Sequence, residues 1–277
     1  EFVKFRVLLG RSLALGFDAV ATGHYARLAV SAEGGIALRR AADRAKDQSY
    51  VLAVAGVAAL RRCLFPLGDA PSKAAVRAEA AALGLPQAAK RDSYDICFVH
   101  DADLGAFLSA RLGVQPGLIV DESGAQVGTH DGAYRFTIGQ RRGLRLGRPA
   151  ADGRPRYVTA LETESGLVRV GPAESLGVDR FGVAAPVFLD DATRAALAAG
   201  GSVECAVQVR AHGAATPCVV SSAAGGPALA GPDPALGGGE APLIQVSLSQ
   251  PIRALAAGQT AVLYEGDRVL ASGIVER

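Results

Sequence analysis

Cys97 is the residue of this sequence best placed for chemistry. It follows a small polar run, 92–95, and the apolar residues around it predict a short strand over 96–99. A thiol is nucleophilic as its thiolate, which nearby positive charge favours, and Lys90 and Arg91 could supply that charge. The alternative is a buried structural cysteine, which is the commoner role of a free Cys. The spacing alone leaves both interpretations open.

Positive charge is concentrated in one segment, although the net charge of the chain is only +2. Between 135 and 156 there is one acid, Asp152, and there are seven arginines: Arg135, Arg141, Arg142, Arg145, Arg148, Arg154 and Arg156. This excess favours binding of a polyanion through counterion release, whereas the alternative is a solvated loop. Glycines between the arginines allow close backbone approach to phosphate, which favours nucleic acid.

Residues 1–103 are predicted to form alternating helices and strands. A short strand over 18–22 follows a first helix. Ligands bind at the carboxyl ends of such strands in α/β sheets, so the loop that starts at Gly23 is a candidate site. Ser72 and Gly84 are the expected N-cap and C-terminal stop of a second helix.

The two remaining predicted domains are rich in β-structure. Short strands and turns are expected over 104–172. Over 173–277 the clean alternation of apolar and polar residues predicts an antiparallel β-barrel. Within one such strand, alternation places Cys205 in the core and Gln208 on the opposite face.

Composition sets the class of protein. A chain of 277 residues is expected to hold two or three domains. No apolar run approaches the roughly 18 residues that span a bilayer, so we expect a soluble protein without a membrane partner. Four scattered cysteines, of which Cys218 has no evident partner, suit neither a metal cluster nor a secreted disulfide scaffold and predict a cytoplasmic location. A sequence that starts at Glu1 and contains no Met is expected to be a fragment that lacks its true start.

Several long motifs follow one another along the chain. They are Ala-Thr-Gly-His-Tyr-Ala-Arg (21–27), Lys-Asp-Gln-Ser-Tyr (46–50), Asp-Ser-Tyr-Asp-Ile-Cys-Phe-Val (92–99), Gly-Thr-His-Asp-Gly (128–132), Thr-Ile-Gly-Gln-Arg-Arg-Gly-Leu (137–144), Pro-Ile-Arg (251–253), Gly-Gln (258–259) and Tyr-Glu-Gly (264–266). Together they resemble the tRNA-specific 2-thiouridylase family. The resemblance covers essentially the whole chain, and the length and order of its motifs make it specific.

The resemblance implies a fold, a reaction and partners. The fold is α/β, the C-terminal part of a PP-loop (adenine nucleotide α-hydrolase-like) ATP pyrophosphatase domain, followed by a small central tRNA-binding domain rich in β-structure and a C-terminal antiparallel β-barrel. The reaction is 2-thiolation of the wobble uridine of tRNA, in which ATP with Mg²⁺ adenylates the C2 oxygen and a cysteine persulfide delivers sulfur. The partners are tRNA and a persulfide donor, either a sulfur-relay protein or a cysteine desulfurase. A disulfide bond is also implied.

The resemblance also implies roles for individual residues. Cys97 carries the persulfide, and Gly23 lies against the nucleotide because its missing side chain permits close approach. The tRNA contacts are His24, Lys46, Asp47, Gln48, Arg210 and Gln259. From the residues alone, His24 is equally well explained as a satisfied loop histidine, and 46–48 as an ordinary polar loop. Ala211 stands beside Arg210 where an aromatic residue is typical, so a stacking contact is expected to be lost.

One signature of the family does not occur in this sequence. A Ser-Gly-Gly-x-Asp-Ser loop cradles ATP phosphates in the family, and neither that loop nor the second catalytic cysteine is found here. Cys63 is not expected to replace that cysteine. The chain alone is therefore expected to bind RNA weakly and not to hydrolyse ATP productively. His130 and Asp131 are too few for a metal site and are expected to form a structural turn.

Two other functions stay open. One is a natural tRNA-binding module that performs no chemistry, and the other is a different ATP-pyrophosphatase-type ligase, such as an argininosuccinate synthetase-like enzyme with a small substrate. A thiol in the context of Cys97 distinguishes the enzyme from the binding module, and the arginine-rich segment argues against a small substrate.

Overall fold

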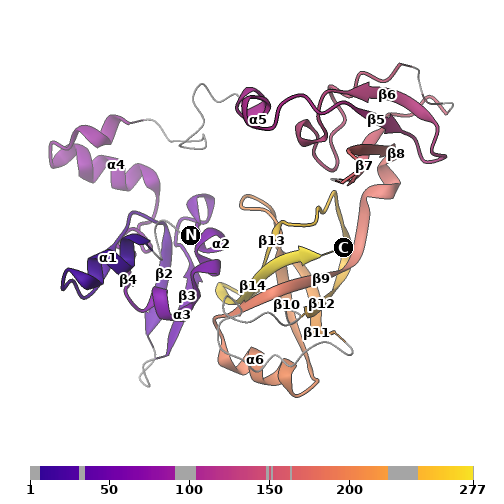
Figure 1. The fold of residues 1–277 in the computed structure, drawn as a ribbon. Helices are drawn as coiled ribbons and strands as arrows, with labels where there is room; N and C mark the ends of the chain where they lie inside the picture. The colour runs from indigo at the N-terminus through magenta and orange to yellow at the C-terminus, as the bar shows by residue number, and fades with distance from the viewer. Residues whose placement is uncertain are drawn as a thin grey trace. The chain divides into compact units, whose positions relative to one another are not determined.

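A computed structural model describes residues 7–30, 35–90, 104–147, 150, 152–162, 164–223 and 243–276 (Figure 1). The chain divides into two compact units. The first comprises Glu1–Lys90, Asp179–Gln250 and Ala257–Arg277, and the second comprises Arg91–Val178 and Pro251–Ala256. Cys97 and its predicted strand lie outside the described residues. Among the described residues, no helix is long and apolar enough to cross a membrane.

The N-terminal part of the first unit mixes helices with short strands. Its elements are α1 (Leu9–Ala14), β1 (Val20–Ala21), β2 (Ala26–Val30), β3 (Ile36–Arg40), α2 (Ser49–Leu52), α3 (Gly56–Leu60), β4 (Cys63–Leu64) and α4 (Lys73–Ala82). Strands β1 and β4 pair in parallel, as expected of an α/β domain. The predicted helix ends are confirmed at α4, where the Ser72 side chain accepts a hydrogen bond from the Ala75 amide and Gly84 has φ +69°.

The second unit holds a small sheet. Strands β5 (Gly117–Val120), β6 (Gln126–His130), β7 (Tyr157–Glu162) and β8 (Leu167–Gly171) are ordered β6-β5-β8-β7, and α5 spans Leu104–Leu112. Its core packs Ile119, Val158 and Val168, all fully buried, with Leu144. The Nε2 atom of His130 lies 2.9 Å from the Gly166 carbonyl oxygen, and its Nδ1 accepts a hydrogen bond from the Gly132 amide. These contacts give His130 a structural role in the turn.

The C-terminal strands form the predicted antiparallel barrel. Among the described residues, the closed order is β13-β10-β11-β12-β9-β14, with β13 returning to β14. These strands are β9 (Gly177–Phe188), β10 (Ser202–Gln208), β11 (Thr216–Ser222), β12 (Leu243–Arg253), β13 (Thr260–Glu265) and β14 (Arg268–Glu276), and α6 (Asp191–Ala198) follows β9. Closure satisfies the sheet edges that an open sheet of this length would expose.

The barrel and the N-terminal part share one core inside the first unit. Strand β3 pairs with β14, so the β2–β3 hairpin extends the barrel sheet. Leu38, Leu52 and Leu60 pack in the same buried cluster as Val262 and Tyr264. Burying large apolar side chains from both parts together ties them into one body, because each side chain loses contact with water only if the other part is in place.

The buried Tyr264 is expected to make the free energy of unfolding depend on pH. Burial raises its pKa from 10.0 to about 12, so the folded state keeps the phenol protonated at a pH where the unfolded chain ionises it. This contribution is complete below pH 10 and is lost as the pH rises to about 12, by about 3 kcal/mol in total. Urea unfolding of Tyr264→Phe should show a smaller fall over this range than unfolding of the parent chain. An identical fall in both proteins would contradict the assignment.

Cys218 has a partner that the sequence did not reveal. It lies directly opposite Cys205 in the β10–β11 pairing, and the two Sγ atoms are 3.6 Å apart. The contact with Cys218 and burial raise the pKa of the Cys205 thiol, whereas the hydrogen bond from Cys205 lowers the pKa of Cys218. Cys63, Cys205 and Cys218, the cysteines in the described part of the chain, are all free thiols, so the implied disulfide is not observed there.

Candidate functional site

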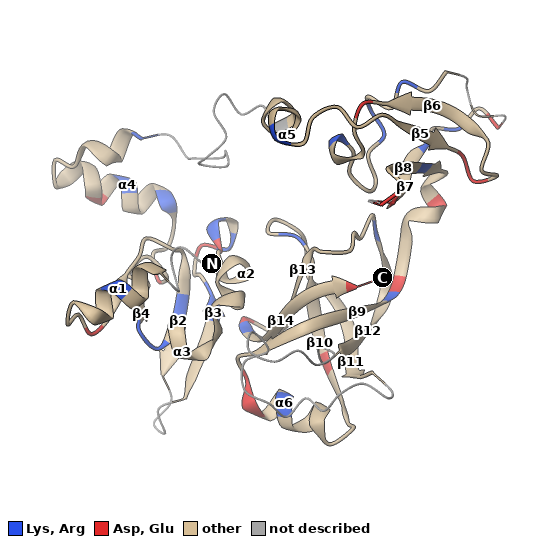
Figure 2. Cartoon of the chain, viewed as in Figure 1, with Lys and Arg blue, Asp and Glu red and all other residues tan. Residues whose placement is uncertain are grey.

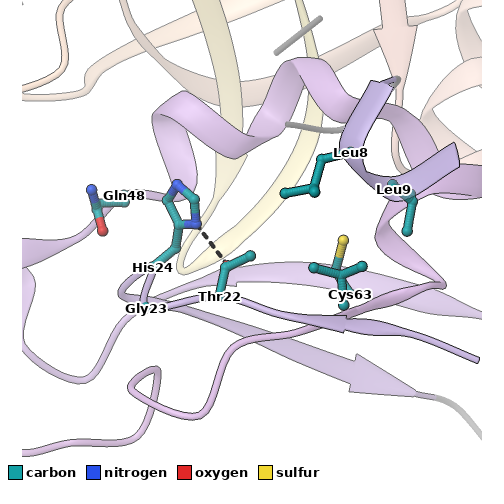
Figure 3. A pocket seen from close by; sticks show the side chains of 8 residues that line it. Leu8, Leu9, Thr22, Gly23, His24, Gln48 and Cys63 are labelled. Atoms are coloured by element: carbon teal, nitrogen blue, oxygen red, sulfur yellow. Dashed lines mark hydrogen bonds between the residues drawn. The ribbon is translucent and has the colours of Figure 1, made fainter. Parts of the chain in front are cut away.

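A cavity of about 380 Å³ opens where β1 ends (Figure 3). It is lined by Leu8, Leu9, Val20, Thr22, Gly23, His24, Gln48 and Cys63. His24 and Gln48 stand at one end in the view, and Leu9 and Cys63 stand at the other. The cavity therefore lies at the strand-to-loop transition that the sequence indicated as a candidate site.

The ring of His24 is held in place by its neighbours. Its Nδ1 lies 2.8 Å from the Thr22 hydroxyl, and its ring meets Phe65 edge to face at 6.0 Å. The side chain is only 8% exposed. Such a ring is fixed before any ligand arrives, which reduces the entropy that binding must overcome.

Gly23 and Gln48 reach the cavity from segments 25 residues apart. A Cβ built on Gly23 would meet only Leu67 Cδ1, at 3.8 Å, so the fold itself has room for a side chain there. Gln48 exchanges two hydrogen bonds with Tyr25: its Oε1 accepts from the Tyr25 amide at 3.0 Å, and its own amide donates to the Tyr25 carbonyl at 2.8 Å. These bonds fasten the second predicted motif against the first.

The lining suits a nucleobase or nucleoside better than a polyphosphate. Leu8, Leu9 and Val20 offer an apolar wall, while Thr22 and Gln48 offer hydrogen-bonding groups. None of the described lining residues is a cation that could neutralise phosphates. The residues present therefore fit the base and sugar of ATP and not its triphosphate.

Cys63 lines the cavity but is not suited to be a nucleophile. Its Sγ donates a hydrogen bond to the Ala59 carbonyl at 3.3 Å, and the residue is 5% exposed. Burial raises the pKa of its thiol, which keeps it protonated. The geometry thus gives no support for assigning Cys63 the role of a second catalytic cysteine.

Asp47 is buried at the centre of its loop. Its side chain is 6% exposed, and its carboxylate accepts hydrogen bonds from the amides of Ala41 (2.9 Å) and Ser49 (3.1 Å) and from the Ser49 hydroxyl (2.8 Å). The carboxylate also pairs with Arg40, at 3.1 Å. Asp47 therefore shapes the loop, and its predicted tRNA contact stays a prediction. Lys46, the last residue of the 3₁₀ turn Arg44–Lys46, is half-buried.

The two predicted tRNA contacts of the barrel lie in loops beside β10 and β13. Arg210 is exposed in the turn after β10, where its carbonyl accepts from the Gly213 amide at 2.9 Å. Gln259 is half-buried just before β13, and its carbonyl accepts from the Val275 amide at 2.7 Å. The Tyr50 hydroxyl donates to the carbonyl of Thr260, next to Gln259, at 2.8 Å. Burial raises the pKa of that phenol, so it remains a donor.

The arginine-rich segment carries less unpaired charge than its composition indicates. Arg156 is only 11% exposed and pairs with Asp152 and with Glu122, an acid outside the segment, at 3.0 Å each. Hydrogen bonds from the Arg154 amide and from Arg156 lower the pKa of Asp152. Acidic and basic positions are accordingly interleaved around β5–β8 (Figure 2).

The remaining arginines of the segment differ in their surroundings. Arg154 lies 3.7 Å from Glu174, Arg135 donates to the Ser109 hydroxyl at 2.7 Å, and Arg148 is outside the described residues. Arg141, Arg142 and Arg145 are exposed. The expected excess of six charges is therefore reduced by acids that lie elsewhere in the sequence, and the exposed arginines are the candidates for phosphate contact.

Comparisons with known proteins cover the whole chain. Family models match residues 1–101 (tRNA methyl transferase HUP domain), 105–172 (tRNA methyl transferase PRC-barrel domain) and 239–275 (Aminomethyltransferase beta-barrel domain). The tRNA-specific 2-thiouridylase MnmA of Beutenbergia cavernae is 53% identical over 275 residues, which are 99% of this chain and 68% of that relative. The protein of the same name from Mycolicibacterium smegmatis is 50% identical over 281 residues, covering 100% of this chain and 71% of the relative.

The chain belongs to the MnmA family of tRNA-specific 2-thiouridylases. The names of two of the domain models refer to a tRNA methyl transferase. The relatives that match nearly the full chain are named 2-thiouridylases, and these whole-chain matches decide the family. The predicted resemblance is confirmed, as is the fold class of this MnmA chain: a HUP-type α/β part, a PRC-barrel middle part and a C-terminal β-barrel.

Two residues at or near this cavity were not singled out from the sequence. Thr22, which holds His24, belongs to the recognised motif 21–27 and could have been found from it. Arg40 lies in none of the motifs, and two of its side-chain contacts, with Gln208 and Tyr264, come from residues far away in the chain, so no local signal marked it.

Proposed function

We propose that this MnmA chain takes part in 2-thiolation of the wobble uridine of tRNA, and that its cavity forms the wall at which the activating nucleotide and the target base meet. The observation that carries the proposal is the convergence of Gly23, His24 and Gln48, from two separate family motifs, on one cavity. A site for a flat, partly polar group is what a base-modifying enzyme needs.

The residues divide the work between nucleotide, tRNA and sulfur. Gly23 faces the nucleotide, whereas His24, Lys46 and Gln48 contact tRNA near the site, joined by Arg210 and Gln259 on the barrel. Asp47 supports these tRNA contacts by stabilising the loop that carries Lys46 and Gln48. ATP, with Mg²⁺, would supply activation of the uridine C2 oxygen when bound, and Cys97 would carry the sulfur received from a persulfide donor protein. We infer a cytoplasmic place of action from these substrates.

The chain's own residues perform three tasks at the cavity. The apolar wall of Leu8, Leu9 and Val20 excludes water from one side of the bound group. The Thr22 hydroxyl keeps the His24 ring in one orientation. Gln48 holds the loop that carries His24 through its two bonds to Tyr25, so the polar groups face the cavity at fixed positions.

The direct test uses a chimera. The segment of the Beutenbergia cavernae relative that precedes its match to this chain is fused to Glu1, and tRNA is incubated with ATP, Mg²⁺ and a persulfide donor. Formation of 2-thiouridine, measured by mass spectrometry of digested tRNA, is the expected result. Absence of 2-thiouridine, in a chimera that binds tRNA and ATP, would contradict the proposed activity.

Gly23→Ala tests the nucleotide contact. The fold has room for the added Cβ, so stability should be unchanged, but a nucleotide lying against the backbone would collide with it. Affinity of the chimera for ATP, measured by calorimetry, should fall on the order of tenfold. Gly147→Ala is the matched control, since a Cβ there would meet only the Val127 carbonyl oxygen, at 3.7 Å. If Gly23→Ala and Gly147→Ala bind ATP with equal affinity, Gly23 does not contact the nucleotide.

Removal of two exposed arginines tests the tRNA contact of the second unit. Arg141→Ala together with Arg142→Ala should weaken tRNA binding, and the slope of log affinity against log salt should fall by about 2. The control is Arg194→Ala, which removes an arginine of α6 that pairs with Asp191. A slope that equals that of the control would contradict phosphate contact by the pair.

A further inference from the structure

A buried polar network joins two loops that are far apart in the sequence. One loop, called here the 46–48 loop, precedes α2, and the other, called the 210–213 loop, follows β10. The side chains of Arg40 and Gln208 lie between them. Both loops and both side chains belong to the first unit, in which the N-terminal part and the barrel share their core.

Arg40 makes the central contacts. Its guanidinium donates to the Asp47 carboxylate at 3.1 Å and to the Gln208 Oε1 at 2.8 Å, and it lies 3.6 Å from the centre of the Tyr264 ring. The side chain is 15% exposed. A planar group with several fixed donors can bridge two acceptors and stack on a ring at once, which a lysine ammonium cannot do.

Gln208 extends the network to the second loop. Its Oε1 accepts from Arg40, and its Nε2 donates to the backbone carbonyls of Arg210 (2.9 Å) and Ala211 (3.2 Å). The residue is 3% exposed. Every polar atom of the amide is therefore used, and the two donors set the path of the chain as it leaves β10.

The opposite side of the network is closed by Tyr264. Its hydroxyl lies 3.1 Å from that of Ser49, which in turn donates to Asp47 at 2.8 Å. Tyr264 and Ser49 are both fully buried. The loops are thus tied to each other by hydrogen bonds that are largely shielded from solvent, so a shift of one loop would leave mostly buried groups unpaired.

We propose that Arg40 and Gln208 are positioning residues that hold the 46–48 loop and the 210–213 loop at a fixed spacing, so that both engage one tRNA molecule. The RNA part of this inference rests on the proposed function, which places tRNA contacts in both loops. Neither residue touches the cavity or is assigned a contact with substrate. They act through Asp47 and through the backbone that carries Arg210.

Two substitutions separate the parts of the network. Gln208→Glu keeps the shape and the acceptor for Arg40 but removes the donors aimed at the 210–213 loop. Arg40→Lys keeps a positive charge near Asp47 but cannot bridge both partners. Glu204→Gln, on an exposed position of the same strand, is the matched control. Hydrogen exchange of the complete chain should show faster exchange of the Gly213 amide in Gln208→Glu, and of both Gly213 and Ala41 in Arg40→Lys.

Binding of an unmodified tRNA transcript gives the functional readout. Gln208→Glu should lower affinity about tenfold in the parent chain and less than about twofold in an Arg210→Ala background, because a residue that acts through Arg210 has no effect once that side chain is gone. A general loss of structure would lower affinity equally in both backgrounds, and that result would overturn the proposal. Unchanged exchange at Gly213 in Gln208→Glu would also overturn it.

The outcome for the parent chain separates this inference from the proposed function. If the parent binds tRNA no better than a single-stranded RNA of equal length, the proposed function fails, and hydrogen exchange alone decides whether the network holds the loops. If the parent binds tRNA selectively, the double-substitution comparison decides whether that holding matters for recognition.

Discussion

Replacement of Cys97 by Ala in the chimera is expected to abolish 2-thiouridine formation and to leave tRNA affinity unchanged. Without the sulfur atom there is nothing to carry a persulfide, and no other side chain can replace a nucleophile that forms a covalent bond with the transferred group. The rate should fall on the order of 10³-fold or more. Single-turnover thiolation and tRNA binding, measured on the same protein, check both parts of the expectation.

Cys63→Ala is the control for this experiment. Cys63 lies in the cavity wall, but its thiol is hydrogen bonded to Ala59 and kept protonated by burial, so its loss should leave most of the activity. Unchanged thiolation in Cys97→Ala would show that Cys97 does not carry the transferred sulfur. Intact tRNA binding without any thiolation, even in the chimera with Cys97 present, would favour the tRNA-binding module.

Asp47→Ala is expected to destabilise the chain by about 3–5 kcal/mol. The substitution removes the charged partner of the mostly buried Arg40 guanidinium and leaves the amides of Ala41 and Ser49 without their acceptor. A buried charge without its partner costs far more than the pair contributes when intact, because the guanidinium is not returned to water. Urea unfolding followed by circular dichroism measures the loss.

Asp69→Ala is the matched control for Asp47. Asp69 also lies near an arginine, with its carboxylate 4.0 Å from Arg27, but its side chain is 88% exposed. Its removal should change stability by less than about 0.5 kcal/mol, because water and salt screen such a pair. If the two variants lose equally little stability while Asp47→Ala alone weakens tRNA binding, then Asp47 contacts tRNA directly and does not act by stabilising its loop.

Elements with local signals were predictable from the sequence. The capped ends of α4 at Ser72 and Gly84 follow from hydrogen-bonding groups and backbone freedom within a few residues, and the structure confirms both. Alternation along β10 was a weaker guide, because Cys205, which it placed in the core, is half-buried, and Gln208, which it placed on the polar face, is buried. Long motifs in order identified the family, since each motif is a contiguous stretch that needs no knowledge of the fold.

Contacts between distant segments were beyond such signals. Alternation placed Gln208 on the polar face of β10 but did not show that Arg40, 168 residues earlier, covers it and buries it to 3% exposure. The pairing of Cys205 with Cys218 depends on the register of two strands. The reduced charge of the arginine-rich segment depends on Glu122, an acid outside it.

By itself, then, the sequence determined the family, the three types of domain and the residues to suspect, including Cys97. Only the tertiary structure decided which of these residues share a cavity, and which, like Asp47, are enclosed by internal partners. The physical reason is that a side chain's exposure, charge state and available hydrogen bonds are set by whatever packs against it. Here those neighbours come from the other end of the chain, as Tyr264 and Gln208 do for Arg40.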